Sequence, residues 1–388
     1  MKREFEYIVL GLGGIGSGAL YWLARQAGGE VLGLEQFEIG HVRGGSQDHS
    51  RIIRLSYHTP GYVALAKAAY AAWTAVEADL GESLIVKTGG LDLFPANAAI
   101  PSGDYTASLD ASSVPYEWLS AAEVMARWPQ FRLNDDVQAL YQAESGIAPA
   151  AKCNAAHLKL AQQHGAVVRD GVGETAVSDQ GGTIAVKAGG ETYRCRKLII
   201  ANGAWTNRTL APYGRQLPLT VTQEQVVYYN TPNAAEFMPD RFPIWIWMDE
   251  PSFYGFPVYG EAGPKAAQDV GGQVVTAESR SFAPNPALQQ RVDDFVQRIL
   301  PHAYGPPILT KTCLYTLTPD RDFIIDMLPE NPNVIVAVGA GHAFKFASVI
   351  GRILSELAVQ GTTNQDISAF RIDREILLAD NPETHFLV

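Results

Sequence analysis

Residues 7–16 read YIVLGLGGIG, an apolar run that leads directly into a glycine-rich turn. The first four residues suit a buried parallel strand, and residues 17–27, rich in alanine, leucine and aromatic side chains, suit a helix. Residues 30–35, EVLGLE, predict a second strand that ends in an acid. A G-x-G-x-x-G pattern in this strand–helix–strand order predicts a dinucleotide-binding fold, whereas the glycines alone would indicate only a turn.

The three glycines of this pattern have different predicted tasks. Gly11 permits the tight turn, Gly13 lets the backbone approach a pyrophosphate, and Gly16 lets the helix and strand pack closely. The phosphates would bind the free N–H groups at the N-terminus of the helix. Glu35 follows Gly16 by 19 residues and can accept hydrogen bonds from ribose hydroxyls, which disfavours a 2′-phosphate and therefore NADP.

The composition limits the kind of protein and its partners. The chain has 388 residues, 47% of them hydrophobic, which allows a large core and favours two domains. Its net charge of −11 repels phosphate backbones, so we expect no nucleic-acid partner. We find no leader-like start, no apolar run near the roughly 18 residues of a membrane span, and too few cysteines for a disulfide framework. These features predict a cytoplasmic protein that does not contact a membrane.

Two further strands end in small residues. Residues 197–205, KLIIANGAW, and residues 333–341, NVIVAVGAG, each read as a buried strand that breaks into a glycine turn. The second turn leads through His342 into a helix that ends near residue 359. The N-terminus of such a helix can stabilise negative charge on a reduced flavin, so the pattern favours FAD over NAD.

Several segments resemble one known family. The fingerprint at 11–16, ANGAW at 201–205 and GAGHAFKFASVIG at 339–351 resemble FAD-dependent amine and amino-acid oxidases of the glutathione-reductase-like type, above all the monomeric sarcosine oxidase and N-methyltryptophan oxidase family. SRIIRLSY at 50–57, FYGFP at 253–257 and KTCLYTLTPDRDFIID at 311–326 follow the family's order and spacing. The resemblance extends over nearly the whole chain, and the segment with Cys313 is its most specific part.

The resemblance implies a set of cofactor contacts. Cys313 stands where the family's cysteine bonds covalently to the flavin 8α-methyl group, although a lone thiol is more often a buried structural cysteine. Arg51 stands where a residue lies against the face of the flavin. Together with the fingerprint, the predicted cofactor-binding residues are Gly11, Gly13, Gly16, Glu35, Ser46, Arg51, Cys313, Gly341, His342 and Lys345.

The resemblance also implies a positively charged substrate pocket. Arg54 and Lys345 stand where the family clamps the substrate carboxylate, an anion that fits the guanidinium fork. Lys265 stands where a lysine helps dioxygen accept electrons, because a fixed cation stabilises the superoxide that forms first. The alternative for each of these residues is a surface cation.

Aromatic residues complete the predicted pocket. Residues 242–257, FPIWIWMDEPSFYGFP, predict a hairpin, in which Tyr254 matches a family residue near the substrate. We predict that Trp245 also contacts the substrate, with Trp247 as a second candidate. The alternative is that these alternating aromatic residues face the core.

Two positions depart from the family pattern. The family carries histidines at two places where this chain has other residues. One place lies in the segment before Arg51, where the matching region here reads Gln47-Asp48-His49, and the other is position 269, which is Asp269 here. Sarcosine itself is therefore in doubt as the substrate. Asp269 can accept hydrogen bonds from sugar hydroxyls or pair with a cationic group, which makes fructosyl amino acids a candidate class.

The predicted function is oxidation of N-substituted α-amino acids by an FAD-dependent oxidase, with an imine or aldehyde, the free amino acid and hydrogen peroxide as products. The predicted catalytic residues are Lys265, Arg51, Tyr254 and Asp269. The alternatives are an amino-acid dehydrogenase linked to NAD or to a partner protein, and a flavin-binding protein without catalysis. We find no His/Cys cluster with zinc spacing, so we expect no metal, and we expect a monomer.

The expected fold is α/β with two interleaved domains. An FAD-binding Rossmann-type domain would use residues 1–85, 145–215 and 310–388. An α+β substrate domain with a mixed sheet would use residues 86–144 and 216–309. The chain would return to the nucleotide-binding domain twice, because a flavin needs contacts on several sides.

Overall fold

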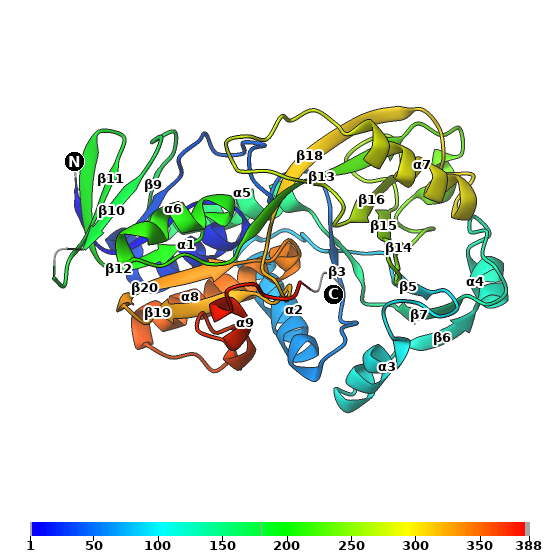
Figure 1. The fold of residues 1–388 in the computed structure, drawn as a ribbon, viewed down its shortest axis with the longest axis horizontal. Coiled ribbons are helices and arrows are strands. Elements are labelled where there is room, and N and C mark those ends of the chain that lie inside the picture. The colour runs from blue at the N-terminus through cyan, green and yellow to red at the C-terminus, as the bar shows by residue number, and fades with distance from the viewer. Residues whose placement is uncertain (1, 180, 385–388) are drawn as a thin grey trace.

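The computed structural model describes residues 2–179 and 181–384, which fold around two large β-sheets (Figure 1). The first sheet has eight strands in the order β10-β11-β12-β1-β2-β9, with β20 paired to β12 and β19 paired to β20. Its strands are β1 (Glu4–Leu10), β2 (Val31–Leu34), β9 (Val167–Arg169), β10 (Ala176–Asp179), β11 (Ile184–Ala188), β12 (Glu191–Ile200), β19 (Ile324–Leu328) and β20 (Asn331–Val338). Strand β1 runs parallel to both β2 and β12, as the predicted strand–helix–strand order requires.

Helices cover the first sheet, because its central parallel strands are apolar on both faces. The helices are α1 (Gly14–Ala27), α2 (Pro60–Leu80), α5 (Ala150–Gln163), α6 (Thr206–Leu210), α8 (Ala347–Gln360) and α9 (Glu375–Leu378). Helix α1 packs against both α5 and α8. A β-carbon added at Gly351 of α8 would lie 2.3 Å from the carbonyl carbon of Gly18 in α1, so glycine lets these two helices approach closely.

The second sheet has nine strands in the order β17-β13-β16-β15-β14-β5-β7-β6, with β18 paired to β13. Its strands are β5 (Gly90–Phe94), β6 (Glu117–Ser120), β7 (Gln138–Gln142), β13 (Thr220–Tyr229), β14 (Ile244–Trp247), β15 (Ser252–Phe256), β16 (Lys265–Asp269), β17 (Gln273–Val274) and β18 (Pro307–Leu317). The sheet is mixed. Strand β14 runs parallel to β5, whereas the pairs β14–β15, β15–β16 and β5–β7 are antiparallel. Helices α3 (Ser102–Ala111), α4 (Ala121–Arg127) and α7 (Pro286–Ile299) accompany it.

The chain crosses between the two sheets several times, which agrees with two interleaved parts. A small third sheet of β3 (Arg51–Ile53), β4 (Val86–Lys87) and β8 (Gly146–Ala148) is formed where these crossings occur. The predicted boundary at residue 310 falls inside β18, which pairs with β13 along its length and therefore belongs to the second sheet. We propose the same two-part division with its last boundary after β18, where the chain returns to the first sheet (Figure 1).

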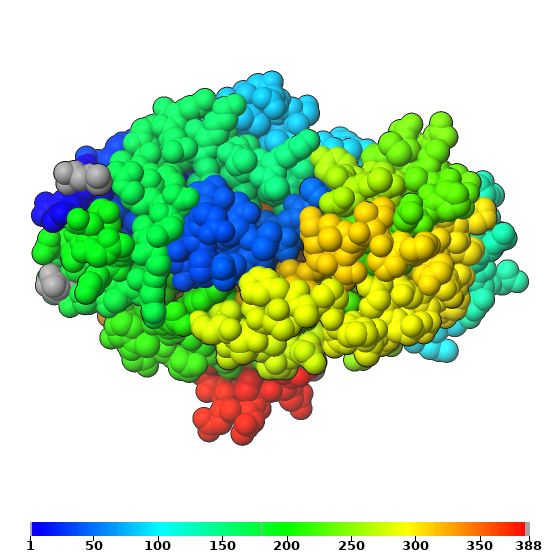
Figure 2. Space-filling model, turned by 90° about the horizontal axis from the view of Figure 1, so that it is seen from above, coloured from blue at the N-terminus to red at the C-terminus, as the bar shows by residue number. Residues whose placement is uncertain are grey.

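The segment after β2, residues 36–50, lies at the surface between the two parts. Figure 2 shows this blue segment at the centre of one face, between green and yellow parts of the chain. Asn154 of α5 donates to the Ser46 carbonyl at 3.0 Å, and Arg280 donates to the Arg43 carbonyl at 2.8 Å. The segment is thus tied to both parts. Within the described residues, none of the helices combines the length and apolar character needed to cross a membrane.

Candidate active site

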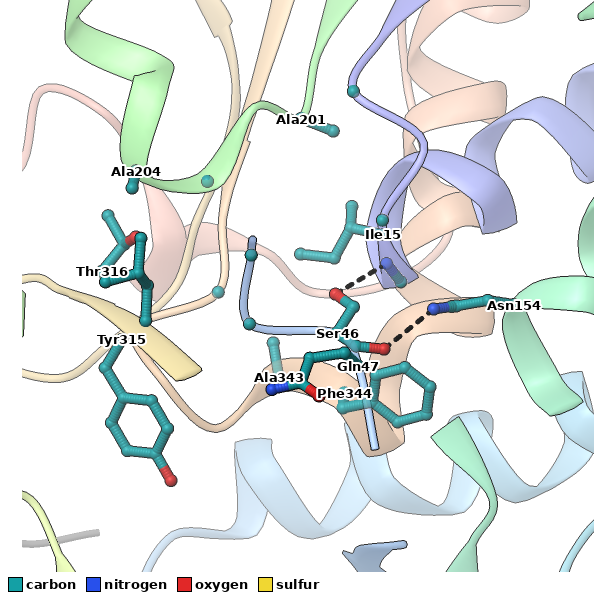
Figure 3. A pocket seen from close by; sticks show the side chains of 18 of the residues that line it. Ile15, Ser46, Gln47, Asn154, Ala201, Ala204, Tyr315, Thr316, Ala343 and Phe344 are labelled. Carbon is teal, nitrogen blue, oxygen red and sulfur yellow. Dashed lines mark hydrogen bonds between the residues drawn. The ribbon is translucent and has the colours of Figure 1, made fainter. Parts of the chain in front are cut away.

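A cavity of about 470 Å³ begins at the carboxyl ends of β1 and β2 and extends to the second sheet. Its lining includes residues 10–15, 201–205, 314–316 and 339–345, together with parts of residues 34–54. Figure 3 shows how Ser46, Ala201, Tyr315 and Phe344 surround part of it, although they come from distant parts of the sequence. The turns that the sequence analysis singled out therefore meet around one space.

The nucleotide end of the cavity consists mainly of backbone groups. Gly11 has a φ of +82°, and a β-carbon there would lie 2.7 Å from the Ala201 carbonyl oxygen. Gly13 precedes α1 without any side-chain cap, while the N–H of Gly14 donates to Ser46 Oγ at 2.9 Å (Figure 3). Gly16 does not line the cavity. It lies behind the turn, where a β-carbon would be 1.7 Å from the Gly11 carbonyl oxygen.

Glu35 lies at the end of β2, where it lines the cavity, as predicted from its spacing. Its carboxylate accepts hydrogen bonds from the N–H groups of Leu12 at 2.8 Å and Phe37 at 3.1 Å. These contacts fix the acid beside the glycine turn. An acid and a helix N-terminus at one end of a cavity suit the ribose and pyrophosphate of a dinucleotide.

Arg54 lies at the other end of the cavity, where the prediction placed a carboxylate clamp. The structure adds a partner that the sequence did not indicate, since Arg54 NH1 lies 2.8 Å from Asp92 Oδ1 of β5. Both side chains are 4% exposed. Burial would lower the pKa of the guanidinium, but Asp92 raises it above its usual value, so Arg54 stays charged.

Lys345 lines the same end and faces a different environment. Its Nζ donates to the His342 carbonyl at 3.2 Å, and among the described residues no carboxylate lies within 4.0 Å of it. Burial, followed by repulsion from Arg54, lowers the pKa of Lys345 to about 7. Its ammonium form is therefore poised to gain stability from an incoming anion.

His342 lies in the glycine turn before α8, beside Lys345. Its Nε2 is 2.8 Å from the Arg321 carbonyl oxygen, so this nitrogen carries the proton and donates. Burial and the nearby Arg321 hold the pKa of the ring well below its usual value, so the imidazole is neutral. Its Nδ1 is buried, has no hydrogen-bond partner among residues 2–179 and 181–384, and can accept from a ligand.

A comparison with known protein families decides the identity of this site. The family described as FAD dependent oxidoreductase matches residues 6–357. The chain belongs to this family. The prediction of its family and its FAD-binding α/β fold is confirmed.

Relatives of this FAD-dependent oxidoreductase cover almost its full length. The monomeric sarcosine oxidase of Streptomyces avermitilis is 34% identical over 379 residues, which are 95% of this chain and 97% of that protein. The N-methyl-L-tryptophan oxidase of Salmonella arizonae is 28% identical, over 96% of this chain and 99% of that protein. The solved structure of NikD, an unusual amino acid oxidase essential for nikkomycin biosynthesis, has a TM-score of 0.84 at 26% identity, over 95% of this chain and 98% of NikD.

The residues of this FAD-dependent oxidoreductase fit FAD. Asn202 Oδ1 and His342 Nδ1 are buried polar atoms without a hydrogen-bond partner in the part of the protein that the structure describes, and both residues line the cavity. The helix N-terminus after Gly13, where Ser46 binds only the N–H of Gly14, offers further N–H groups to a pyrophosphate, and Glu35 offers acceptors to a ribose. No group of three or more His, Cys, Asp or Glu residues suited to a metal occurs in the part of the chain that the structure describes.

Cys313 lies in β18, between Lys311 and Tyr315, which both line the cavity. Alternation along the strand places the Cys313 thiol on the same face as these two residues, but Cys313 itself does not line the cavity, which residues 314 and 316 of the other face also border. Cys313 is 6% exposed, and burial raises its pKa to about 11, although Arg51 opposes this shift. Arg51 itself lines the cavity and donates to the carbonyl of Gln47 at 2.6 Å.

Lys265 lies behind the cavity wall instead of in it. Its Nζ is 3.1 Å from Asp48 Oδ2 and donates to the Ser50 carbonyl at 2.9 Å. Burial lowers the pKa of this lysine to about 8, although Asp48 opposes the shift. Asp48 does line the cavity, so it lies between Lys265 and that space.

The prediction for Trp245 is wrong. Trp245 is 1% exposed, does not line the cavity, and stacks on Phe295 of α7 with ring centroids 5.9 Å apart. Trp247 belongs to the same hydrophobic core. The strand alternates, so Ile246 points into the cavity, which Tyr254 also lines. The alternative that the tryptophans face the core is therefore correct.

Arg321 is a site residue that the sequence analysis missed. It is 1% exposed, lines the cavity, and its NH2 lies 3.4 Å from Asp269 Oδ2 at the end of β16. Its Nε donates to the Ala340 carbonyl at 3.1 Å. An arginine within the sequence Asp-Arg-Asp reads as part of a surface turn, so only the tertiary fold reveals it. Tyr315, also missed, would have followed from alternation with Cys313.

Proposed function

We propose that this FAD-dependent oxidoreductase oxidises the secondary amine of N-substituted α-amino acids and passes the electrons to dioxygen. The observation that carries the proposal is Lys345, a half-buried cation that lines the cavity and has no carboxylate within 4.0 Å among the described residues. A substrate carboxylate supplies that anion. Relatives named as sarcosine and N-methyltryptophan oxidases support an amine of this class.

The chain's own residues bind and orient the substrate. Bound FAD supplies the redox chemistry, since it accepts a hydride equivalent from a C–H bond beside the amine nitrogen and passes two electrons to dioxygen. Lys345 binds the carboxylate, and this contact fixes where the C–H bond lies. Arg54 adds positive potential from the same wall, and its ion pair with Asp92 keeps it in place. The released imine hydrolyses to an aldehyde and the free amino acid, and dioxygen becomes hydrogen peroxide.

Lys265 acts in the oxygen half-reaction under this proposal. The first electron transfer to dioxygen forms an anion, and a fixed buried ammonium stabilises it. Lys265 is held by Asp48 and Ser50 behind the cavity wall, so its charge has a defined position. Replacing it with methionine should slow reoxidation of the reduced protein far more than its reduction by substrate.

We further propose that Cys313 forms a covalent thioether with FAD. The family resemblance at Cys313 supports this link, as does its place in β18 beside residues 311 and 314–316, which line the cavity. After acid precipitation, the yellow colour should stay with wild-type protein and with the Cys153→Ser control, whose cysteine is buried in α5. In Cys313→Ser the colour should pass to the supernatant. Colour lost from the wild type would contradict the link.

The part of the substrate attached to nitrogen faces Asp269 and Tyr254, under this proposal. Asp269 is 24% exposed in its side chain and contacts Arg321 through one oxygen, Oδ2. Its other oxygen can accept hydrogen bonds from hydroxyl groups of a larger substituent. Fructosyl amino acids therefore join N-methyl amino acids in the proposed substrate class.

A peroxide-coupled screen tests the function. It should compare sarcosine, N-methyltryptophan, pipecolate, proline and fructosyl-glycine, each also as an anaerobic reductant of the flavin. Flavin reduction with peroxide release supports the oxidase, and reduction without peroxide favours a dehydrogenase linked to a partner protein. Failure of every compound to reduce the flavin would favour a protein that binds FAD without this catalysis. The predicted monomer and cytoplasmic location are tested by light scattering and cell fractionation.

A further inference from the structure

Asp48 is a buried carboxylate that the proposed reaction does not use directly. It belongs to the segment after β2, is 7% exposed and lines the cavity. Its φ of +87° lies in the left-handed region, which residues other than glycine rarely adopt. The Tyr228 hydroxyl donates to its two oxygens at 2.9 and 3.0 Å. The backbone therefore holds this acid in an uncommon conformation, with its carboxylate inside the protein.

Three cations surround this one carboxylate. Lys265 Nζ lies 3.1 Å from Oδ2, Lys311 Nζ lies 3.2 Å from Oδ1, and Arg51 NH1 lies 3.7 Å from Oδ2. Burial would raise the pKa of the Asp48 carboxyl, but Lys265 and then Arg51 lower it well below its usual value. Asp48 is thus ionised throughout the neutral range, and the group of four side chains carries a net positive charge.

Lys265 is the cation that depends most on Asp48. Its side chain is 1% exposed, whereas those of Arg51 and Lys311 are 21% and 25% exposed, so water can stabilise their charges. Apart from Asp48, its polar contact is the Ser50 carbonyl, and its Nζ lies 4.1 Å from the centroid of the Phe256 ring. Without the carboxylate, repulsion from Arg51 and the loss of hydration would both favour the neutral amine.

We propose that Asp48 is a positioning residue for the oxygen half-reaction, which holds Lys265 in its ammonium form and at a fixed place beside the cavity. The inference rests on the proposed function, because the charge of Lys265 matters to turnover only if dioxygen takes the electrons. A merely structural Asp48, which anchored the surface segment to Tyr228, would change stability without changing the pH at which Lys265 loses its proton.

The titratable groups around Lys265 and its partner Asp48 come from four elements. They are Asp48 from the surface segment, Arg51 from β3, Tyr228 from β13, and Lys311 and Cys313 from β18. Since Lys265 has a pKa of about 8, its charge is complete below this pH and is lost as the pH rises through it. Reoxidation by dioxygen should slow over the same interval.

The decisive experiment measures Asp48→Asn in the holoprotein. The flavin is reduced with dithionite, which needs no substrate, and is then mixed with dioxygen at pH 6 to 9. We expect the midpoint of the rate profile to move down by roughly one to two pH units, because a charge partner at this distance shifts a pKa by about 1–3. Reoxidation at pH 8 should then be roughly tenfold slower, while anaerobic reduction by substrate stays within about twofold.

Two further variants fix the sign of the effect. Lys311→Met removes a positive charge that competes with Lys265 for Asp48, so the midpoint of the rate profile should move up. Because the Lys311 side chain is partly exposed, we expect this variant to fold. Glu261→Gln is the matched control, since Glu261 contacts Lys311 and His49 and, among the described residues, forms neither a hydrogen bond nor an ion pair with Lys265. It should keep the wild-type midpoint. An unchanged midpoint in both Asp48→Asn and Lys311→Met would overturn the proposal.

A measurement without turnover separates this inference from the proposed function. Titration of the ¹⁵N-labelled lysine Nζ signals by NMR, with Lys265→Met for assignment, reports the Lys265 proton directly. A lower pKa in Asp48→Asn shows that Asp48 holds Lys265 in its ammonium form, whether or not dioxygen reoxidises the wild type; failure of reoxidation would contradict the oxidase function and, with it, the role of this charge in turnover. The same Lys265 pKa in the wild type and in Asp48→Asn would contradict the inference.

Discussion

The two ends of the cavity are built in different ways. The nucleotide end depends on close backbone approach, with Gly16 behind the turn and Gly11 within it. The substrate end depends on charged side chains from separate elements, such as Arg54 with Asp92 and Arg321 with Asp269. Steric contacts between backbones tolerate almost no change, whereas a charge pair can be altered in steps. Variants at the nucleotide end should therefore lose stability and FAD binding together, whereas variants at the substrate end should lose stability, substrate affinity or selectivity by different amounts.

The largest effect should come from Gly16→Ala at the nucleotide end. The added β-carbon would lie 1.7 Å from the Gly11 carbonyl oxygen, so the turn or α1 must move. We expect a loss of about 3 kcal/mol or more in the free energy of unfolding, and weak FAD binding. Gly61→Ala is the control, because a β-carbon there meets nothing within 4 Å, and it should lose no stability. Denaturant titrations and FAD titrations of the apoprotein measure both, and equal results would contradict the steric argument.

The next largest effect should come from Asp92→Asn, which tests whether the substrate end also contributes to the stability of the fold. The variant removes the carboxylate that faces the Arg54 guanidinium, and both side chains are 4% exposed. Breaking a buried ion pair costs about 3–5 kcal/mol, since the remaining charge stays buried. Glu117→Gln breaks the exposed pair with Arg127, at 3.0 Å, and should cost about 1 kcal/mol or less. Similar losses of unfolding free energy in the two variants would show that burial does not decide the cost.

The same contrast explains what the sequence could predict. Gly11, Gly13, Gly16 and Glu35 act within one continuous strand–helix–strand unit, so their spacing alone indicated their places. The family resemblance added Cys313 and the cationic residues, at positions that it matches one by one. Asp92 as the partner of Arg54 could not be predicted, because the contact joins residues 38 apart in sequence, one in β5 and the other directly after β3.

Strand orientation accounts for the remaining errors. Alternation predicts that Trp245 and Ile246 point to opposite faces, but the sequence does not say which face borders the cavity. Both are apolar, so neither was marked as the core residue. Arg321 has a φ of +60° and lies in a turn whose direction no local pattern indicated. The sequence thus predicted which segments form the site better than it predicted which side chains face it.

A smaller, graded effect should come from Lys345→Met, which removes a cation without a carboxylate within 4.0 Å in the described part of the chain. We expect substrate KM to rise by roughly 10- to 100-fold, since a hydrogen bond to a charged group contributes about 1.5–3 kcal/mol. FAD content should not change if the nucleotide end is independent. The wild-type affinity for the carboxylate should also fall as the pH rises above about 7, because Lys345 then loses its proton. Steady-state KM measured from pH 6 to 9 tests both statements, and a flat profile would count against Lys345 as the anchor.

The smallest effect should come from Asp269→Asn, which tests the outer wall of the substrate end. Because Asp269 also supports the charge of Lys345, the variant should weaken binding of every carboxylate somewhat. The ratio of kcat/KM for fructosyl-glycine to that for sarcosine removes this shared loss. We expect the ratio to fall by roughly three- to tenfold, less than a fully buried charged hydrogen bond would give, because the Asp269 side chain is 24% exposed. An unchanged ratio would mean that Asp269 serves Arg321 and Lys345 only, and that the substituent on nitrogen is selected elsewhere in the cavity.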